Sequence, residues 1–289
     1  MKQSNEIKIG FFGTPPHAVT TLEALASASY QIAFVVTTPD RAVGRGLVMT
    51  PTPVKIWALG RNIPIFQPEN LKDAACATEL SKFNCDAFVV IAYGKIIPEE
   101  ILNIPNGKSI NIHGSLLPKL RGASPIETAI LEDMKETGVT LIKMDSKMDH
   151  GPIVAIEKVA YEPWPPKVEV LRKVIVDKGN ELLVSVLPGW IAGEIKEQEQ
   201  DHSQATIARK ITKEDALVDL SGDPYLNFRK IQAYHEWPVA YFLFKAGTKD
   251  IRVKITQVSF KDGKLEIQKV IPEGKNEMSY KDFLSGYSR

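Results

Sequence analysis

The sequence predicts an α/β fold with a parallel sheet, followed by a small β-barrel domain. Three observations predict it. Short apolar runs alternate with segments of helical spacing between Ile7 and Gly151. The run Ala87–Ala92 (AFVVIA) is apolar throughout, as expected of a strand that helices cover on both faces. From Ile207 onward, short alternating strand patterns replace this strand–helix alternation.

The first strand is expected at Ile7–Phe12, an apolar-rich run that ends at Gly13. The later strands of the first part are expected at Ile32–Thr37, Ile63–Phe66, Ala87–Ala92, Ser109–His113 and Gly138–Met144. The segments of helical spacing between them are Val19–Ala28, Val54–Arg61 and a helix that ends with Glu79–Phe83. Such alternation predicts a parallel sheet covered on both faces.

Beyond Gly151 the pattern weakens. Glu162–Lys167 (EPWPPK) is rich in Pro and is expected to be a loop, and Val168–Leu187 has helical spacing. Gly189–Ala205 is polar, as in a linker. The remaining expected elements are a helix at Asn227–Ala233, strands at Tyr241–Lys245, Ile251–Phe260 and Lys264–Val270, and a last turn at Pro272–Gly274. We therefore predict an α/β domain over residues 1–190, a linker over 191–206 and a β-barrel domain over 207–289.

The composition is that of an ordinary globular protein, with 44% apolar and 25% charged residues among 289. Cys76 and Cys85 are the only cysteines, and we expect both to be reduced structural thiols. No Cys/His cluster has zinc-ligand spacing, so no metal is expected. No signal peptide is visible, and the apolar runs are far shorter than the ~20 residues of a membrane span. We expect a cytoplasmic protein without a membrane partner.

The charge is distributed unevenly along the chain. Residues 207–289 contain 15 Lys and Arg against 11 Asp and Glu, a net +4, whereas the other 21 and 24 give −3. A basic C-terminal domain on a mildly acidic body suggests a polyanionic partner, although a solvated surface with a chance asymmetry fits the same counts.

The densest group of polar residues is Asn111 to Pro118 (NIHGSLLP), at the end of an expected strand. Ligands of open α/β sheets bind outside the carboxyl ends of the strands. Residues two apart in a strand point to the same side, so Asn111 and His113 are expected to face one site. An amide and an imidazole together can hold a carbonyl oxygen and stabilise negative charge on it. A structural histidine with satisfied hydrogen bonds is the alternative.

A second group, Met144 to Pro152, follows the strand Gly138–Met144. Asp149 precedes a Gly-Pro turn and could approach His113 to orient and charge its ring. Local hydrogen bonding in the turn is the other interpretation. Gly13-Thr14-Pro15 is not a G-x-G-x-x-G fingerprint, and the chain has no Walker motif, which argues against nicotinamide and ATP chemistry.

A loop rich in Gly, Arg and Pro is expected from Pro39 to Pro53, and its first part, Pro39 to Leu47, contains Arg41 and Arg45. Two arginines placed in this way can meet phosphate oxygens, or they can belong to a solvated surface loop.

Further motifs extend these groups over nearly the whole chain: GTP at 13–15, TTPDRAVGRG at 37–46, TPTPVK at 50–55, VVIAYGKIIP at 89–98, NIHGSLLPKLRGASPI at 111–126, ETGVTLIKMD at 136–145, MDHGPI at 148–153, ARKITKEDALVDL at 208–220, WP at 237–238 and PEGKNEMSYKDF at 272–283. Together they resemble the methionyl-tRNA formyltransferase family. The N-x-H…D set with SLLP is typical of folate-dependent formyltransferases, and the arginine loop followed by TPTPVK narrows the resemblance to the tRNA enzymes.

The resemblance implies a Rossmann-like formyltransferase domain, an OB-like C-terminal domain that binds tRNA, and transfer of a formyl group from 10-formyltetrahydrofolate to methionyl initiator tRNA. It assigns catalysis to Asn111, His113 and Asp149. It assigns folate contacts to Ser115, Leu116, Leu117, Pro118, Ala92, Tyr93 and Gly94, and tRNA contacts to Arg41, Arg45 and Lys210. We expect a monomer.

The chain departs from the family pattern at Leu47 and Val48, where lysines are common, and at His150, where Thr or Ala is usual. Two rival functions remain. One is a formyltransferase acting on a nucleotide-linked amino sugar, which shares the N-x-H…D chemistry. The other is a non-catalytic RNA-binding protein on a degenerate scaffold. The arginine loop and the basic C-terminal domain argue against the first, and the intact catalytic set argues against the second.

Overall fold

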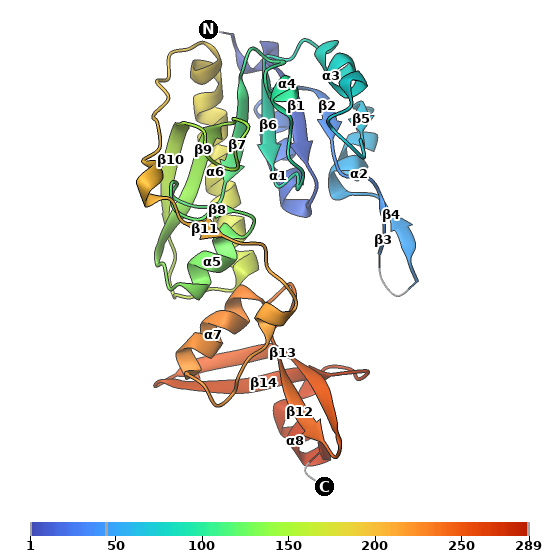
Figure 1. The fold of residues 1–289 in the computed structure, drawn as a ribbon, viewed down its shortest axis with the longest axis vertical. Coiled ribbons are helices and arrows are strands. Elements are labelled where there is room, and N and C mark those ends of the chain that lie inside the picture. The colour runs from blue at the N-terminus through green and yellow to red at the C-terminus, as the bar shows by residue number, and fades with distance from the viewer. Residues whose placement is uncertain (1, 44–45, 288–289) are drawn as a thin grey trace. The chain divides into compact units, whose positions relative to one another are not determined.

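A computed structural model describes residues 2–43 and 46–287, and the chain divides into two compact units (Figure 1). The first unit comprises Met1–Arg121, Gly138–Val159 and Lys173–Thr206. The second unit combines Ile207–Arg289 with two segments from earlier in the chain, Gly122–Thr137 and Ala160–Arg172. Each unit is therefore assembled from segments that are distant in sequence.

The first unit is built around a seven-stranded sheet of order β10-β9-β7-β6-β1-β2-β5. Its strands are β1 (Lys8–Gly13), β2 (Gln31–Val36), β5 (Ile65–Phe66), β6 (Ala87–Ile91), β7 (Ser109–His113), β9 (Glu136–Lys143) and β10 (Ile153–Ala160). Five neighbouring strands, β7, β6, β1, β2 and β5, pair in parallel. This confirms the predicted α/β sheet. β9 pairs antiparallel with β7, so β9 begins at the end of the sheet where β7 finishes. β10 was not predicted.

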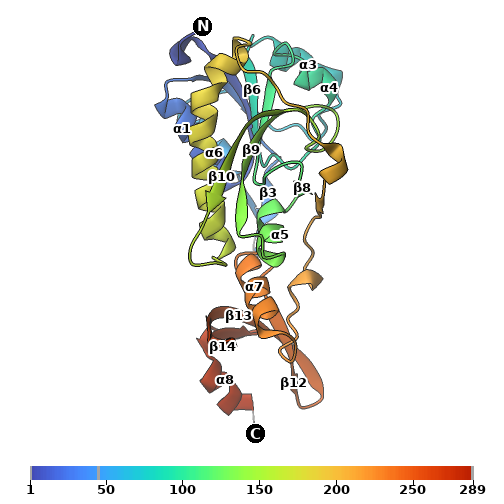
Figure 2. The same cartoon turned by 90° about the vertical axis from the view of Figure 1, so that its left-hand side faces the viewer.

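Helices cover both faces of this sheet (Figure 2). α1 (Pro16–Ser27) and α6 (Val168–Ile191) lie side by side on one face, where the Thr21 hydroxyl donates to the Asn180 side-chain oxygen over 2.7 Å. α2 (Pro53–Leu59) adjoins α1. α3 (Ala74–Ser81) and α4 (Glu99–Leu102) lie on the other face, where their leucines pack into a cluster with the aromatic rings of β1, β2 and β6.

α6 lies close to the sheet at Gly179. A Cβ at this position would lie 2.9 Å from Ile112 and 3.0 Å from Val139, so only a glycine allows this contact without displacing its neighbours. Ile112 of β7 therefore faces α6. Because side chains alternate along a strand, Asn111 and His113 lie on the opposite face from α6.

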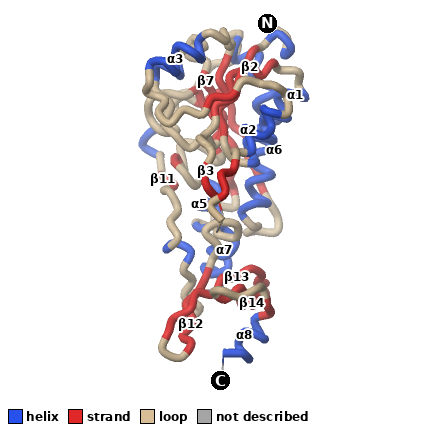
Figure 3. Tube along the Cα trace, turned by 90° about the vertical axis from the view of Figure 1, so that its right-hand side faces the viewer, coloured by secondary structure: helices blue, strands red, loops and turns tan. Residues whose placement is uncertain are grey.

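The expected loop from Pro39 to Pro53 contains an unpredicted hairpin (Figure 3). β3 (Arg41–Val43) pairs antiparallel with β4 (Val48–Thr50), and Arg41 lies opposite Thr50. Leu47, Val48 and Met49 are 72%, 66% and 63% exposed. Val43, Val48 and Thr50 are β-branched, a residue type enriched in strands, but the Gly and Arg content of the segment obscured this signal.

The second unit contains a four-stranded antiparallel sheet, which confirms the small β domain. Its order is β12 (Tyr241–Ala246), β13 (Lys249–Lys261), β14 (Lys264–Pro272), β15 (Met278–Ser279). α7 (Pro224–Ala233) lies near the predicted position, whereas α5 (Pro125–Leu131) and α8 (Tyr280–Tyr287) were not predicted. α8 is fixed by Phe283, which is fully buried against aromatic rings of β12. The remaining short elements are β8 (Arg121–Gly122), β11 (Ile207–Ala208) and three 3-10 turns, Ser4–Glu6, His202–Gln204 and Glu214–Ala216.

Candidate active site

The structure brings Asn111, His113 and Asp149 together. Asp149 Oδ1 accepts a hydrogen bond of 3.3 Å from the Asn111 side-chain nitrogen and lies 3.6 Å from His113 Nδ1. The His113 side chain is 6% exposed and that of Asp149 is 13% exposed. An amide, an imidazole and a carboxylate thus meet in a largely desolvated place, where electrostatic interactions are stronger than in water.

A backbone carbonyl sets the orientation of the His113 ring. Nε2 lies 2.8 Å from the carbonyl oxygen of Leu120. A carbonyl only accepts, so Nε2 carries a hydrogen, and Nδ1 is the ring nitrogen that faces Asp149. The sequence suggested Asp149 as the orienting group, whereas Leu120 makes the hydrogen bond of ordinary length.

The turn that carries Asp149 has little conformational freedom. Asp149 has a φ of 48°, in the left-handed region that non-glycine residues seldom adopt. Two residues later, a Cβ on Gly151 would lie 1.9 Å from the Lys143 carbonyl oxygen. Only glycine allows the turn to lie this close to the end of β9.

Thr140 supports the loop from Ser115 to Pro118, and sequence reasoning did not identify it. Thr140 lies opposite His113 in the β7–β9 pairing. Its hydroxyl donates to the Ser115 carbonyl oxygen over 2.6 Å and accepts from the Leu117 backbone nitrogen over 3.1 Å. Ser115 and Leu117 are buried, whereas Leu116 and Pro118 are partly exposed. A threonine inside an apolar strand gave no distinguishing signal.

The segment Ala92–Gly94 follows β6, the strand beside β7. Ala92 and Gly94 are exposed, with φ values of 47° and 84°, and open space surrounds the Cβ position of Gly94. Tyr93 is 2% exposed, and its ring packs against Phe12. The outward-facing part of this segment is therefore backbone rather than the tyrosine ring.

The residues predicted to contact tRNA lie in separate parts of the chain. Arg41 is exposed in β3, in the first unit, and Lys210 is exposed in the second. Arg45 lies outside the described residues.

An unpredicted group anchors the base of the β3–β4 hairpin. The Asp40 carboxylate accepts from the Gln67 side-chain nitrogen over 2.7 Å and pairs with the Lys55 ammonium at 2.6 Å. The hydrogen bond from Gln67 has the largest effect in lowering the pKa of the Asp40 carboxyl below its ordinary value, and the hydrogen bond from Lys55 lowers it further.

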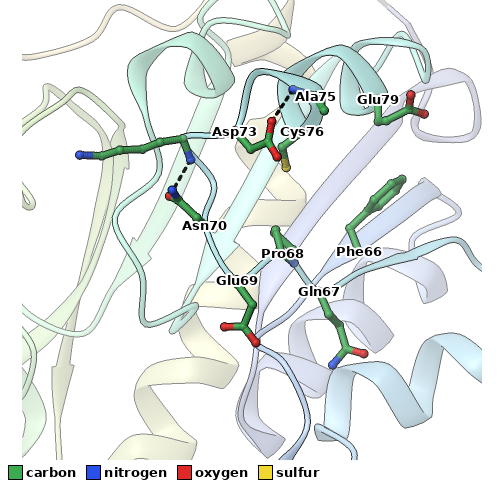
Figure 4. Close-up of a pocket in the computed structure, with 10 residues that line it drawn as sticks. Phe66, Gln67, Pro68, Glu69, Asn70, Asp73, Ala75, Cys76 and Glu79 are labelled. Atoms are coloured by element: carbon green, nitrogen blue, oxygen red, sulfur yellow. Dashed lines mark hydrogen bonds between the residues drawn. The ribbon is translucent and has the colours of Figure 1, made fainter.

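A separate cavity of about 660 Å³ lies beside the start of α3 (Figure 4). It is lined by Phe66, Gln67, Pro68, Glu69, Asn70, Lys72, Asp73, Ala75, Cys76 and Glu79. None of the predicted catalytic or folate residues lines it. Cys76 and Cys85 are free thiols, and burial raises the pKa of both.

Within residues 2–43 and 46–287, no three His, Cys, Asp or Glu side chains are arranged to hold a metal ion. No helix in the same ranges is long and apolar enough to cross a membrane.

Residues 7–187 match the formyl transferase family. The chain is 42% identical over 250 residues to a methionyl-tRNA formyltransferase of Sulfurihydrogenibium sp., covering 86% of this chain and 79% of the relative. It is 36% identical to a methionyl-tRNA formyltransferase of Methylococcus capsulatus, covering 98% and 97%. The second similarity includes the C-terminal β domain.

Solved structures share the fold. A methionyl-tRNA formyltransferase from Clostridium thermocellum aligns with a TM-score of 0.60 at 17% identity, over 92% of this chain and 98% of that chain. HypX from Aquifex aeolicus, solved with tetrahydrofolic acid, aligns with a TM-score of 0.67 at 14% identity. The alignment covers 98% of this chain but only 47% of HypX.

Proposed function

The chain belongs to the formyl transferase family, and from this membership we propose that it transfers the formyl group of 10-formyltetrahydrofolate to the α-amino group of methionyl initiator tRNA. The products are formylmethionyl-tRNA, which serves translation initiation, and tetrahydrofolate. The observation that carries the proposal is the proximity of the Asn111, His113 and Asp149 side chains, at the carboxyl end of β7. We also propose a cytoplasmic location, which the proposed tRNA substrate supports.

The reaction requires one bond to form and one to break. The methionyl nitrogen bonds to the formyl carbon, the bond from that carbon to N10 of the folate breaks, and a proton moves from the amine to N10. 10-Formyltetrahydrofolate supplies the activated formyl group. Negative charge develops on the formyl oxygen, so the chain must supply donors there and an acceptor for the amine proton.

His113 Nδ1 is the donor for the developing charge. Its Nε2–H is held by Leu120, so a second proton on the ring resides on Nδ1. The Asp149 carboxylate, 3.6 Å away, stabilises the resulting imidazolium. Asn111 gives one N–H to Asp149 and has a second for the formyl oxygen. Asp149 receives the amine proton, directly or through water. The proton then passes to N10 of the departing folate, which restores the carboxylate.

The folate is expected at the edge where β6 and β7 end. These strands pair in parallel, with Val90 opposite Asn111, so the segments that follow them start side by side. Ala92 and Gly94 offer exposed backbone groups there, and Leu116 and Pro118 offer partly exposed apolar surface. Polar backbone beside apolar side chains suits a flat ring with polar edges, which supports the folate assignment to Ala92, Tyr93 and Gly94 and to the Ser115–Pro118 loop.

The acceptor end of the tRNA is assigned to the β3–β4 hairpin. Arg41 and Arg45 would meet its phosphates, and the anchored Asp40 would hold the base of the hairpin. Lys210 and the basic C-terminal β domain would contribute further phosphate contacts.

An acceptor screen tests this function. Purified protein with 10-formyltetrahydrofolate is offered charged initiator tRNA, charged elongator tRNA and nucleotide-linked amino sugars, and both formyl transfer and tRNA binding are measured. We expect transfer to methionyl initiator tRNA. Transfer to an amino sugar alone would establish the rival transferase, and tRNA binding without transfer to any acceptor would establish a non-catalytic RNA-binding protein.

A further inference from the structure

We propose that Gln200, held by Arg121, is a positioning residue that keeps the turn carrying Asp149 at its observed distance from His113. The role rests on the proposed function, because it concerns the catalytic efficiency of that site. Both residues belong to the first unit, and they are 5% and 7% exposed. Gln200 acts on Asp149 through the backbone of the turn.

The Gln200 amide connects the Arg121 guanidinium to two carbonyl oxygens of the turn. Its oxygen accepts from Arg121 Nε at 3.2 Å and from Nη2 at 2.6 Å. Its nitrogen donates to the carbonyl oxygens of Asp149, at 3.0 Å, and Gly151, at 2.7 Å. The two residues on either side of His150 are thus bound by one side chain.

This arrangement admits only one orientation of the amide. Arg121 is a pure donor and the two carbonyls are pure acceptors, so the Gln200 oxygen must face the guanidinium and its nitrogen must face the turn. All four hydrogen bonds would be lost or replaced by repulsion in the flipped state. Because the group is buried, water offers little compensation, and the turn is held in a single position.

Arg121 supports the same turn by a second route. Its Nη2 also donates to His202 Nδ1 over 2.9 Å, and the His202 ring stacks on that of His150 at 4.1 Å and 9°. His150 in turn lies 2.7 Å from the Asp145 carboxylate, at the start of the turn. These hydrogen bonds and the ring stacking together explain how Asp149 remains at a φ of 48°, which a non-glycine residue without such support seldom adopts. It also gives His150, a departure from the family pattern, a structural partner.

Gln200→Glu is the discriminating variant. A glutamate has nearly the same shape and pairs with Arg121 at least as well, so packing is kept and the guanidinium compensates the added negative charge. Its second oxygen faces the carbonyl oxygens of Asp149 and Gly151 and repels them. Gln198→Glu, on the same segment, is the matched control because its side chain is exposed.

Two measurements on the full chain decide the proposal. In transfer assays with methionyl initiator tRNA, Gln200→Glu should lower kcat by about 10- to 100-fold, because displacements near 1 Å carry costs of this size, with both KM values near those of the parent. Its Tm should fall, because two buried hydrogen bonds are lost, while its circular dichroism spectrum stays that of the folded parent. In hydrogen exchange, the peptide covering residues 145–152 should exchange faster in Gln200→Glu. Gln198→Glu should match the parent in both.

A kcat within twofold of the parent in folded Gln200→Glu, or a rise in the folate KM alone, overturns the positioning role. If Gln200→Glu does not fold, Gln200→Asn, which is too short to reach both partners, is judged by the same criteria. If the parent itself transfers nothing, the proposed function fails, and the hydrogen-exchange comparison still decides whether Gln200 holds the turn: equal exchange overturns that role.

Discussion

Replacing Gly151 with alanine tests how closely catalysis depends on the Asp149 turn. The added Cβ would lie 1.9 Å from the Lys143 carbonyl oxygen, and Cβ contacts below 3.0 Å are essentially never seen. The turn and the end of β9 must therefore separate by about 1.1 Å, since a packed interior does not absorb such an overlap. β9 is held within the sheet, so the turn is the part expected to move.

This movement should weaken both interactions of Asp149. The carboxylate is 3.3 Å from the Asn111 nitrogen and 3.6 Å from His113 Nδ1, and neither distance can grow by 1 Å and remain a direct contact. Gly151 also provides one of the two carbonyls that Gln200 binds. A misplacement of about 1 Å can cost about 10²-fold in rate, so we expect kcat to fall by about that factor.

The assay is steady-state formyl transfer to methionyl initiator tRNA, with Tm measured in parallel. Overpacking of this kind costs about 1–3 kcal/mol, which leaves most of the protein folded at assay temperature. Gly60→Ala is the control, because its Cβ would have ordinary contacts of 3.7 and 3.8 Å, and it should keep parental kcat. A folded Gly151→Ala enzyme with kcat within twofold of the parent would refute the claim that the turn must be held this closely.

Three other predictions concern the catalytic residues and the tRNA. His113→Ala and Asp149→Asn should each lower kcat by at least about 10²-fold with an unchanged circular dichroism spectrum, and near-normal turnover by either variant removes that residue from catalysis. Arg41→Ala should raise the KM for tRNA and leave folate affinity unchanged; the reverse pattern contradicts its assignment to the tRNA. Neutralising three exposed lysines of the C-terminal β domain should make log tRNA affinity depend less steeply on log salt concentration. The slope should change by about 0.7–0.9 for each phosphate that is no longer neutralised, and an unchanged slope would show that these lysines are only solvated. The lysines are Lys249, Lys261 and Lys264.

The predictable part of the fold was the part with strong local patterns. The parallel strands at Ile7–Phe12 and Ala87–Ala92 are rich in apolar residues because helices cover both faces of the sheet, and this pattern is visible in a single sequence. β3 and β4 were missed because three-residue strands at a Gly-rich loop carry almost no periodicity. α8 was missed because its helix depends on Phe283 packing against β12, which is a tertiary contact.

The kind of chemistry at the site could be predicted from the amino-acid sequence. Asn111, His113 and Asp149 were identified from their place at strand ends and from family motifs, since residue types and spacing are local properties of the chain. How these groups are held became visible only in the folded protein. Leu120 orients the imidazole, Thr140 supports the Ser115–Pro118 loop, and Gln200 fixes the turn, each through backbone groups that any residue carries. Every residue has a backbone carbonyl, so the residue type does not show which carbonyl accepts a hydrogen bond. The partners are therefore known only once the chain has folded.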